Sequence, residues 1–164
     1  MIRTALGQDS HRFLDREDPA KPLILGGVVL PDSGLSLSAN SDGDVLLHAL
    51  TNAISGLTGV NVLGTRADEL CRAGVTDSRE YVREALKSLR EPIDHVSFSV
   101  EALRPKLAEH IPAIRASVAT LLGIQPEQVG LTATTGEGLT GPGRGEGIAV
   151  LCLVTAGNPR GDET

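Results

Sequence analysis

Aromatic residues are scarce in this chain: its 164 residues include no tryptophan, one tyrosine and two phenylalanines. The chain is long enough for one domain with a real core, which Leu, Val, Ile and Ala must therefore build. The sequence also has no basic run, and its formal net charge is −6. This charge argues against nucleic acid as a partner, because a phosphate-binding surface needs concentrated Lys and Arg.

Cysteines and long hydrophobic runs are few as well. Cys71 and Cys152 fit neither a metal-binding nor a disulfide spacing, so we expect buried thiols in a reducing compartment. The longest apolar run, residues 148–156, is about half the length that spans a bilayer. Residues 1–18 lack the apolar segment of a signal peptide. We therefore expect a soluble, cytoplasmic protein that binds no membrane.

The strongest local pattern lies in residues 41–56 and predicts a long helix. Ser41 and Asp42 are expected N-cap residues, with Asp44 in the first turn, where the helix dipole favours negative charge. One broad arc of this helix is apolar: Val45, Leu46, Ala49, Leu50, Ala53, Ile54 and Leu57. The opposite arc is polar: Asp44, His48, Thr51, Asn52 and Ser55. We expect the first arc to face a core and the second to present a ligand.

The remaining elements follow from periodicity and from turn and cap residues. Strands are expected over residues 2–7, 93–102, 129–135 and 147–155, and a hairpin about a Gly-Gly turn over 23–31. Helices are expected after residues 76–80, ending before Pro92, and over 111–123. Residues 58–75 have no clean period, which indicates a long loop with at most one helical turn, near 68–72. Residues 157–164 read as a polar, disordered tail.

Asp9, His11 and His48 form a candidate metal site. If the first strand continues through Asp9 and His11, these side chains share one of its faces, and His48 projects from the predicted helix. Two imidazoles and a carboxylate leave a fourth tetrahedral position open, a pattern typical of catalytic zinc. The alternative is that His48 is an ordinary surface or core histidine, since a single histidine on a helix face is more often that than a ligand.

A glycine-rich stretch, residues 134–147, is a second candidate for ligand binding. Its backbone amides and threonine hydroxyls could wrap a phosphate. It is not a P-loop, because the Lys-Ser/Thr ending is missing. A flexible hairpin or a loop between subunits is the alternative.

Taken together, these residues resemble the 2-C-methyl-D-erythritol 2,4-cyclodiphosphate synthase family, zinc-dependent enzymes of the non-mevalonate isoprenoid pathway. The matching motifs run in family order from about residue 3 to 155: Asp9-x-His11, Ile24–Val28, Ser41–Thr51, Asp77–Glu80, Ala102–Lys106, His110–Pro112 with Arg115, Ala133–Thr135, Glu137 and Gly143–Ala149. The resemblance implies one α+β two-layer domain over residues 1–156, with a four-stranded mixed sheet, a small hairpin and helices packed on one face. It also implies a homotrimer with active sites between subunits.

The resemblance implies a phosphorus–oxygen lyase. In that reaction the 2-phosphate of 4-diphosphocytidyl-2-C-methyl-D-erythritol 2-phosphate attacks the β-phosphorus, so that a cyclic diphosphate forms and CMP leaves. Zn²⁺ would lie on Asp9, His11 and His48, and Mg²⁺ or Mn²⁺ on the substrate diphosphate near Glu137. The other implied site residues are Asp44, Thr134 and Thr135, with Glu137, for catalysis, and Ser41, Ala102, Pro105, Lys106 and Arg144 for binding. Among these, 102–106 would hold the cytosine, and Arg144 with Glu146 would line a trimer-axis cavity for an isoprenoid diphosphate.

The chain departs from the family pattern where the substrate would be held. Asn40 replaces a histidine, Asn52 an aspartate, and Val62 an aspartate expected near the ribose hydroxyls. A Phe-Pro-Asp loop is absent from residues 65–75, and Thr132, Gly138 and Pro142 replace two lysines and a threonine. Three interpretations stay open: a divergent cyclodiphosphate synthase, a paralogue that applies the same metal chemistry to another diphospho substrate, and a non-catalytic trimer that binds a nucleotide or isoprenoid phosphate.

Overall fold

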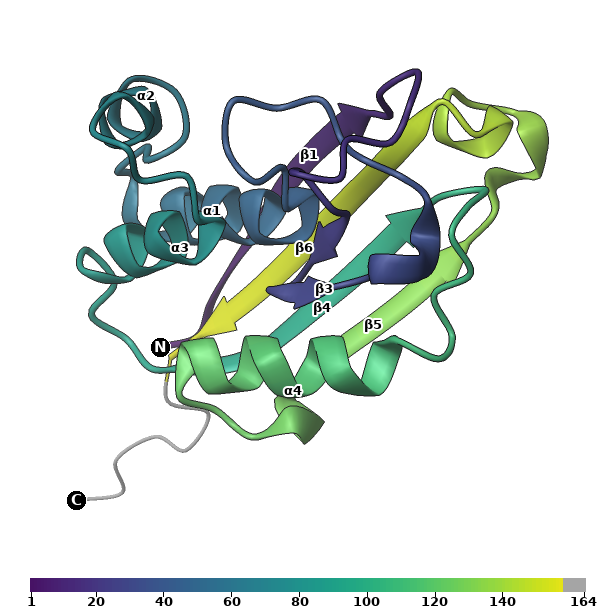
Figure 1. Cartoon of the computed structure of the whole chain (residues 1–164). Helices are drawn as coiled ribbons and strands as arrows, with labels where there is room; N and C mark the ends of the chain where they lie inside the picture. Colours follow the sequence, from purple (N-terminus) through teal and green to yellow (C-terminus); the bar gives the residue numbers. More distant parts are fainter. Residues whose placement is uncertain (158–164) are drawn as a thin grey trace.

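The computed structural model describes residues 1–157 and contains a mixed sheet of the order β1-β6-β4-β5 (Figure 1). The strands are β1 (Arg3–Arg12), β4 (Ile93–Glu101), β5 (Val129–Thr134) and β6 (Gly147–Ala156). β6 runs antiparallel to both β1 and β4, whereas β4 and β5 are parallel. The predicted mixed sheet is therefore confirmed. The disordered tail predicted for 157–164 lies outside the described residues, apart from Gly157.

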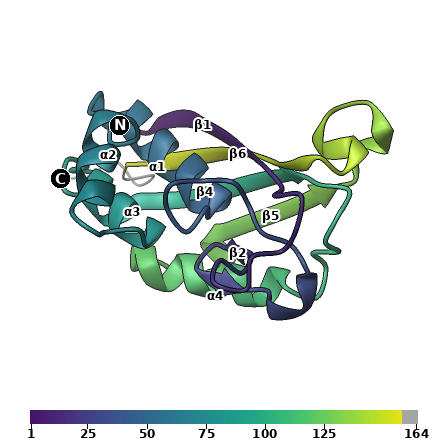
Figure 2. The same cartoon turned by 45° about the horizontal axis from the view of Figure 1, so that its top comes forward.

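Helices pack on one face of this sheet, as predicted. They are α1 (Val45–Thr58), α2 (Thr65–Arg72), α3 (Ser78–Leu86) and α4 (Ile111–Leu122). α1 contacts β1 and β6, α4 contacts β5, and α3 packs on α1. The glycine-rich segment before β6 extends beyond the end of the sheet (Figure 2). No helix within residues 1–157 is long and apolar enough to cross a membrane.

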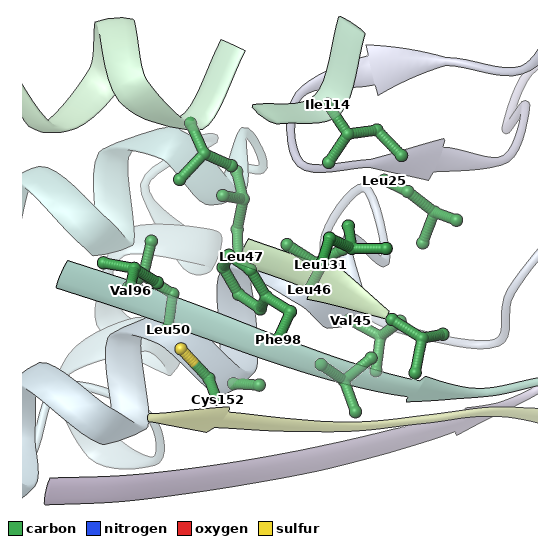
Figure 3. Packing of buried hydrophobic residues seen from close by; sticks show 14 of the residues in the cluster. Leu25, Val45, Leu46, Leu47, Leu50, Val96, Phe98, Ile114, Leu131 and Cys152 are labelled. Atoms are coloured by element: carbon green, nitrogen blue, oxygen red, sulfur yellow. The ribbon is translucent and has the colours of Figure 1, made fainter. Parts of the chain in front are cut away.

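The core lies between the sheet and these helices and is mostly aliphatic, as the composition requires. Figure 3 shows buried side chains from α1, α4 and the hairpin gathered over the strands. In β4, Val96, Phe98 and Val100 are buried, while Ser97 and Ser99 alternate with them on the opposite face. This alternation confirms the predicted half-buried strand.

The predicted hairpin is present and determines how α1 begins. β2 (Ile24–Leu25) and β3 (Val28–Val29) are joined by Gly26 and Gly27, whose φ angles of 61° and 78° suit glycine. Both glycine N–H groups donate to the carboxylate of Asp44, at 2.9 and 2.6 Å. The same carboxylate accepts from the backbone N–H of Leu47 at 3.0 Å and is the N-cap of α1. The prediction of Ser41 or Asp42 as N-cap was wrong, because the hairpin fixes Asp44 there.

Two features of the helices differ from what the sequence alone indicates. The polar arc of α1, which was expected to present a ligand, is largely buried: His48 is 7% exposed, and Thr51 and Ser55 are buried too. α3 covers this arc, so α1 is enclosed between the sheet and a second helix. In the region predicted as a loop, α2 forms a full helix over Thr65–Arg72. Few of its residues face the core, and Arg66 pairs with Glu84 of α3, a contact that local periodicity does not reveal.

Candidate metal centre

Close packing of α1 on β1 brings the three predicted ligands together. A Cβ atom on Gly7 of β1 would lie 2.1 Å from the carbonyl oxygen of Ala49 and 2.3 Å from the backbone nitrogen of Ala53. Glycine at this position therefore allows the helix to lie directly against the strand. Asn52 adds a link, because its side-chain nitrogen donates to the carbonyl of Gln8 at 3.0 Å. One turn before Asn52, His48 consequently faces the last residues of β1.

Asp9, His11 and His48 converge on one point. His48 Nδ1 lies 3.0 Å from Asp9 Oδ2 and 2.9 Å from His11 Nε2, and His11 Nε2 lies 3.2 Å from Asp9 Oδ2. Ligands around one tetrahedral zinc are roughly 3.3 Å apart, so the spacing fits this donor set. Among residues 1–157 these three form the one group of such side chains able to hold a metal ion. β1 reaches Arg12, so the condition that the sequence prediction placed on Asp9 and His11 is met.

The electrostatics of the cluster favour an ionised Asp9. Partial burial opposes its ionisation, but its contacts with the imidazoles of His11 and His48 outweigh that burial and hold the pKa of the carboxyl well below its usual range. The carboxylate is therefore an anionic donor, ready for a cation. His48 is also held at its other ring nitrogen, since its Nε2 lies 3.2 Å from Ser41 Oγ and 2.9 Å from Ser78 Oγ.

A cavity of about 290 Å³ opens beside His11 and His48. Its wall includes the predicted Ser41, and also Cys71 and Tyr81, which sequence reasoning did not place there. Burial, and then the nearby Cys71, raise the pKa of Tyr81 to about 12, so its hydroxyl stays protonated and donates to the carbonyl of Val75. The sequence analysis missed the part of the cavity wall that α2 supplies, because it predicted a loop in that region.

Five predicted residues meet at a second pocket, of about 220 Å³, at the other edge of the sheet. They are Ala102, Pro105, Lys106, Thr134 and Thr135. The pocket lies where β4 and β5 end and α4 begins. In sequence these residues form two segments, which the parallel pairing of β4 and β5 brings side by side. Within a single chain they do not join the Asp9–His11–His48 cluster.

The carboxylate of Asp44 is not open to either pocket. It is fully buried, its carboxylate is used by the three backbone N–H groups described above, and burial raises its pKa to about 6. We expected Asp44 on a ligand-presenting face; its observed contacts are those of a residue that fixes the start of α1.

Glu137 and Arg144 lie in the glycine-rich segment. Glu137 is exposed, with the unusual φ of 52°, and accepts from the Thr135 hydroxyl at 3.4 Å. Arg144 pairs with Glu146 at 2.9 Å, and Glu146 also pairs with Arg12 at 3.4 Å. Arg12 and Glu146 border a further pocket of about 280 Å³ that His11 also lines.

The positions that depart from the family pattern have distinct surroundings. Val62 is only 2% exposed and packs in the core, so it offers nothing to a sugar hydroxyl. Asn52 holds α1 to β1, as described above. Asn40 lines the cavity next to the cluster, and its carbonyl accepts from the Cys71 thiol at 3.3 Å.

Known proteins are similar to this chain in both sequence and fold. A model described as the YgbB family matches residues 2–156. The chain is similar to 2-C-methyl-D-erythritol 2,4-cyclodiphosphate synthases of Chlamydia trachomatis serovar L2b (45% identity over 158 residues, covering 94% of this chain and 88% of that protein) and Chlamydia caviae (47% over 158 residues, 94% and 89%). Among solved structures it is similar to the bifunctional IspDF from Campylobacter jejuni, with a TM-score of 0.84 and 32% identity over 95% of this chain and 42% of that one. It is also similar to a CDP-bound 2C-methyl-D-erythritol-2,4-cyclodiphosphate synthase (TM-score 0.78, 30% identity, 93% and 98% covered).

Proposed function

This chain belongs to the YgbB family, and from that premise we propose that it is a cyclodiphosphate synthase, a phosphorus–oxygen lyase of non-mevalonate isoprenoid biosynthesis. The proposed reaction converts 4-diphosphocytidyl-2-C-methyl-D-erythritol 2-phosphate to the cyclic diphosphate and releases CMP. The observation that carries the proposal is the convergence of Asp9, His11 and His48 beside an open cavity. We further propose that the protein works in the cytoplasm.

Asp9, His11 and His48 would hold Zn²⁺, because two imidazole nitrogens and one carboxylate oxygen are a donor set that zinc prefers. A zinc ion held there would draw electron density from a phosphoryl oxygen and offset phosphate charge. Ser41 borders the same cavity and can hydrogen-bond a ligand in it. Glu137 would help to hold Mg²⁺ or Mn²⁺ against the substrate diphosphate.

The second pocket suits the cytidine end of such a substrate. Ala102, Pro105 and Lys106 would hold the base, while the hydroxyls of Thr134 and Thr135 would bind and orient the phosphates. Positioning of this kind matters because an intramolecular attack on phosphorus needs the two groups in line. The similarity to a CDP-bound synthase supports this assignment.

A homotrimer would unite these two half-sites. The metal cluster lies at the β1 edge of the sheet and the nucleotide pocket at the β5 edge, and two strands lie between them. Since neighbouring strands are about 4.8 Å apart, the two edges are separated by about 14 Å. The sheet face without helices also carries exposed Leu6, Leu151 and Leu153, suited to contact between subunits. Arg144 and Glu146 would then line an axial cavity for an isoprenoid diphosphate.

A second candidate function is the same metal chemistry on a different diphospho substrate. The specific observation in its favour is the burial of Val62, which removes a polar partner expected for a sugar hydroxyl. A site built to bind a hydroxyl discriminates strongly through that contact, so its loss changes which substrate is held best.

The deciding experiment is incubation of the purified protein with zinc, magnesium and the cytidine-diphospho substrate, with CMP detected by chromatography. We expect CMP from the wild type and none from His48→Ala, which should also lose its zinc. CDP binding without CMP release would refute the proposed substrate. A screen of other cytidine-diphosphate esters would then separate the second candidate from a non-catalytic trimer.

A further inference from the structure

We propose that Asp42 and Ser78 are positioning residues that hold His48 in the tautomer with its proton on Nε2. The lone pair of Nδ1 then points at the place where a metal ion would bind. The part of this inference that concerns metal affinity rests on the proposed metal site. The tautomer itself can be tested without any metal.

The contacts form a continuous chain from a carboxylate to the cluster. Ser78 Oγ lies 2.9 Å from His48 Nε2 and also donates to Asp42 Oδ1. Asp42 is fixed by two backbone groups, since it accepts from the N–H of Ser78 at 3.0 Å and from that of Asp44 at 3.1 Å. On the other side of the ring, His48 Nδ1 faces Asp9 and His11.

Counting donors and acceptors determines where the proton lies. A carboxylate can only accept, so the hydroxyl hydrogen of Ser78 is directed to Asp42. Toward His48, Ser78 Oγ can then only accept, and Nε2 must be the donor. Ser41 Oγ, 3.2 Å from the same nitrogen, has its own hydrogen and could serve either tautomer. On the other side of the ring, a proton on His11 Nε2 can serve both His48 Nδ1, at 2.9 Å, and Asp9 Oδ2, at 3.2 Å, so Nδ1 needs no proton of its own. Ser78 therefore decides the tautomer.

Because these side chains are buried, water cannot easily replace the hydrogen bonds between them. Ser78 is fully buried and His48 is 7% exposed. Throughout residues 1–157, every buried side-chain nitrogen and oxygen has a hydrogen-bond partner. The opposite tautomer would leave Ser78 Oγ and His48 Nε2 as two facing acceptors, and its proton on Nδ1, beside Asp9, would have to leave before a metal ion could bind there. Groups that orient a ligating histidine in this way typically change metal affinity 10- to 100-fold when removed.

The sequence places the two residues where they can serve both helices. Asp42 lies two residues before the N-cap of α1, and Ser78 is the first residue of α3. The carboxylate therefore lies at the N-terminus of α3, where the helix dipole favours it. The hydrogen bond from Asp42 N–H to the Thr76 carbonyl, at 2.9 Å, joins the same two segments. The hydrogen bonds that run from Asp42 through Ser78 to His48 are thus part of the contact that holds α3 over His48.

The test uses Ser78→Ala and Asp42→Ala, with Ser55→Ala as the control. Ser55 is a buried hydroxyl on α1 that bonds to Val62 N–H and not to His48. Alanine at position 42 removes the carboxylate that accepts the Ser78 hydrogen, which frees that hydrogen for Nε2 and favours the opposite tautomer. Circular dichroism is the check that each variant is folded.

Two measurements decide the outcome. In metal-free protein, two-bond ¹H–¹⁵N correlation should show Nε2–H for His48 in the wild type and a shift toward Nδ1–H in Asp42→Ala. Zinc affinity, from chelator competition, should fall 10- to 100-fold in Ser78→Ala and less than about twofold in Ser55→Ala. An Nδ1–H tautomer in the wild type, or equal zinc affinity in Ser78→Ala and Ser55→Ala, overturns the proposal. If the wild type binds no zinc, the proposed function fails, and the NMR spectrum alone decides this inference.

Discussion

Gly7→Ala should disrupt both the fold and the metal cluster. The added Cβ would lie 2.1 Å from the Ala49 carbonyl oxygen, whereas ordinary contacts begin at 3.4 Å. Both neighbours are backbone atoms of a helix, so no side chain can rotate away. α1 would have to move from β1 by on the order of 1 Å, and overpacking of this kind costs about 3 kcal/mol.

The same displacement should weaken metal binding. His48 is carried by α1, and Asp9 and His11 by β1. Metal–ligand distances tolerate only about ±0.2 Å, far less than the expected movement. We therefore expect Gly7→Ala to lose zinc affinity at least as strongly as Ser78→Ala does.

The assay is thermal unfolding followed by circular dichroism, together with chelator competition for zinc. Gly130→Ala is the matched control, because a Cβ on that strand residue meets its nearest neighbour at an ordinary 3.6 Å. For a chain of this length, a loss of about 3 kcal/mol corresponds to a fall of about 6–12 °C in the melting temperature. Equal stability and zinc affinity in the two variants would refute the argument that close approach at Gly7 builds the site.

Two further predictions concern buried titratable groups. Asp44 has a pKa raised from 3.8 to about 6, so the native state holds a proton that the unfolded chain releases between these values. The stability advantage of wild type over Asp44→Asn should therefore shrink by about 2 kcal/mol from pH 4 to 6 in urea titrations, and growth of that advantage would contradict the assignment. Cys152 is fully buried, which raises its pKa, whereas Cys71 is partly exposed beside the cavity. Ellman's reagent should find one reactive thiol in folded protein and two in urea, and two equally fast thiols in folded protein would refute this.

Much of the fold could be predicted because its signals are local. The alternation from Val96 to Val100 identifies β4, and the Gly26-Gly27 turn identifies the hairpin. α2 could not be found in this way, because it depends on partners such as Glu84 from another helix. The burial of the polar arc of α1 was missed for the same reason, since the covering helix α3 begins twenty residues after α1 ends.

The candidate site likewise contains residues that local patterns reveal and residues that only the tertiary structure reveals. Asp9, His11 and His48 could be grouped because strand and helix periods place each on a known face. Ser78 could not be linked to His48, because thirty residues separate them and only the tertiary fold brings them together. Asp44 was assigned to a ligand-presenting face because no local pattern shows that the hairpin glycines cover its carboxylate.

The central claim is that Asp9, His11 and His48 share one cation. Crystals grown with zinc and measured at the zinc absorption edge test it most directly. We predict one anomalous peak per chain, about 2.0–2.2 Å from Asp9 Oδ2, His11 Nε2 and His48 Nδ1. A peak elsewhere, or zinc bound through the Nε2 atom of His48, would contradict the account.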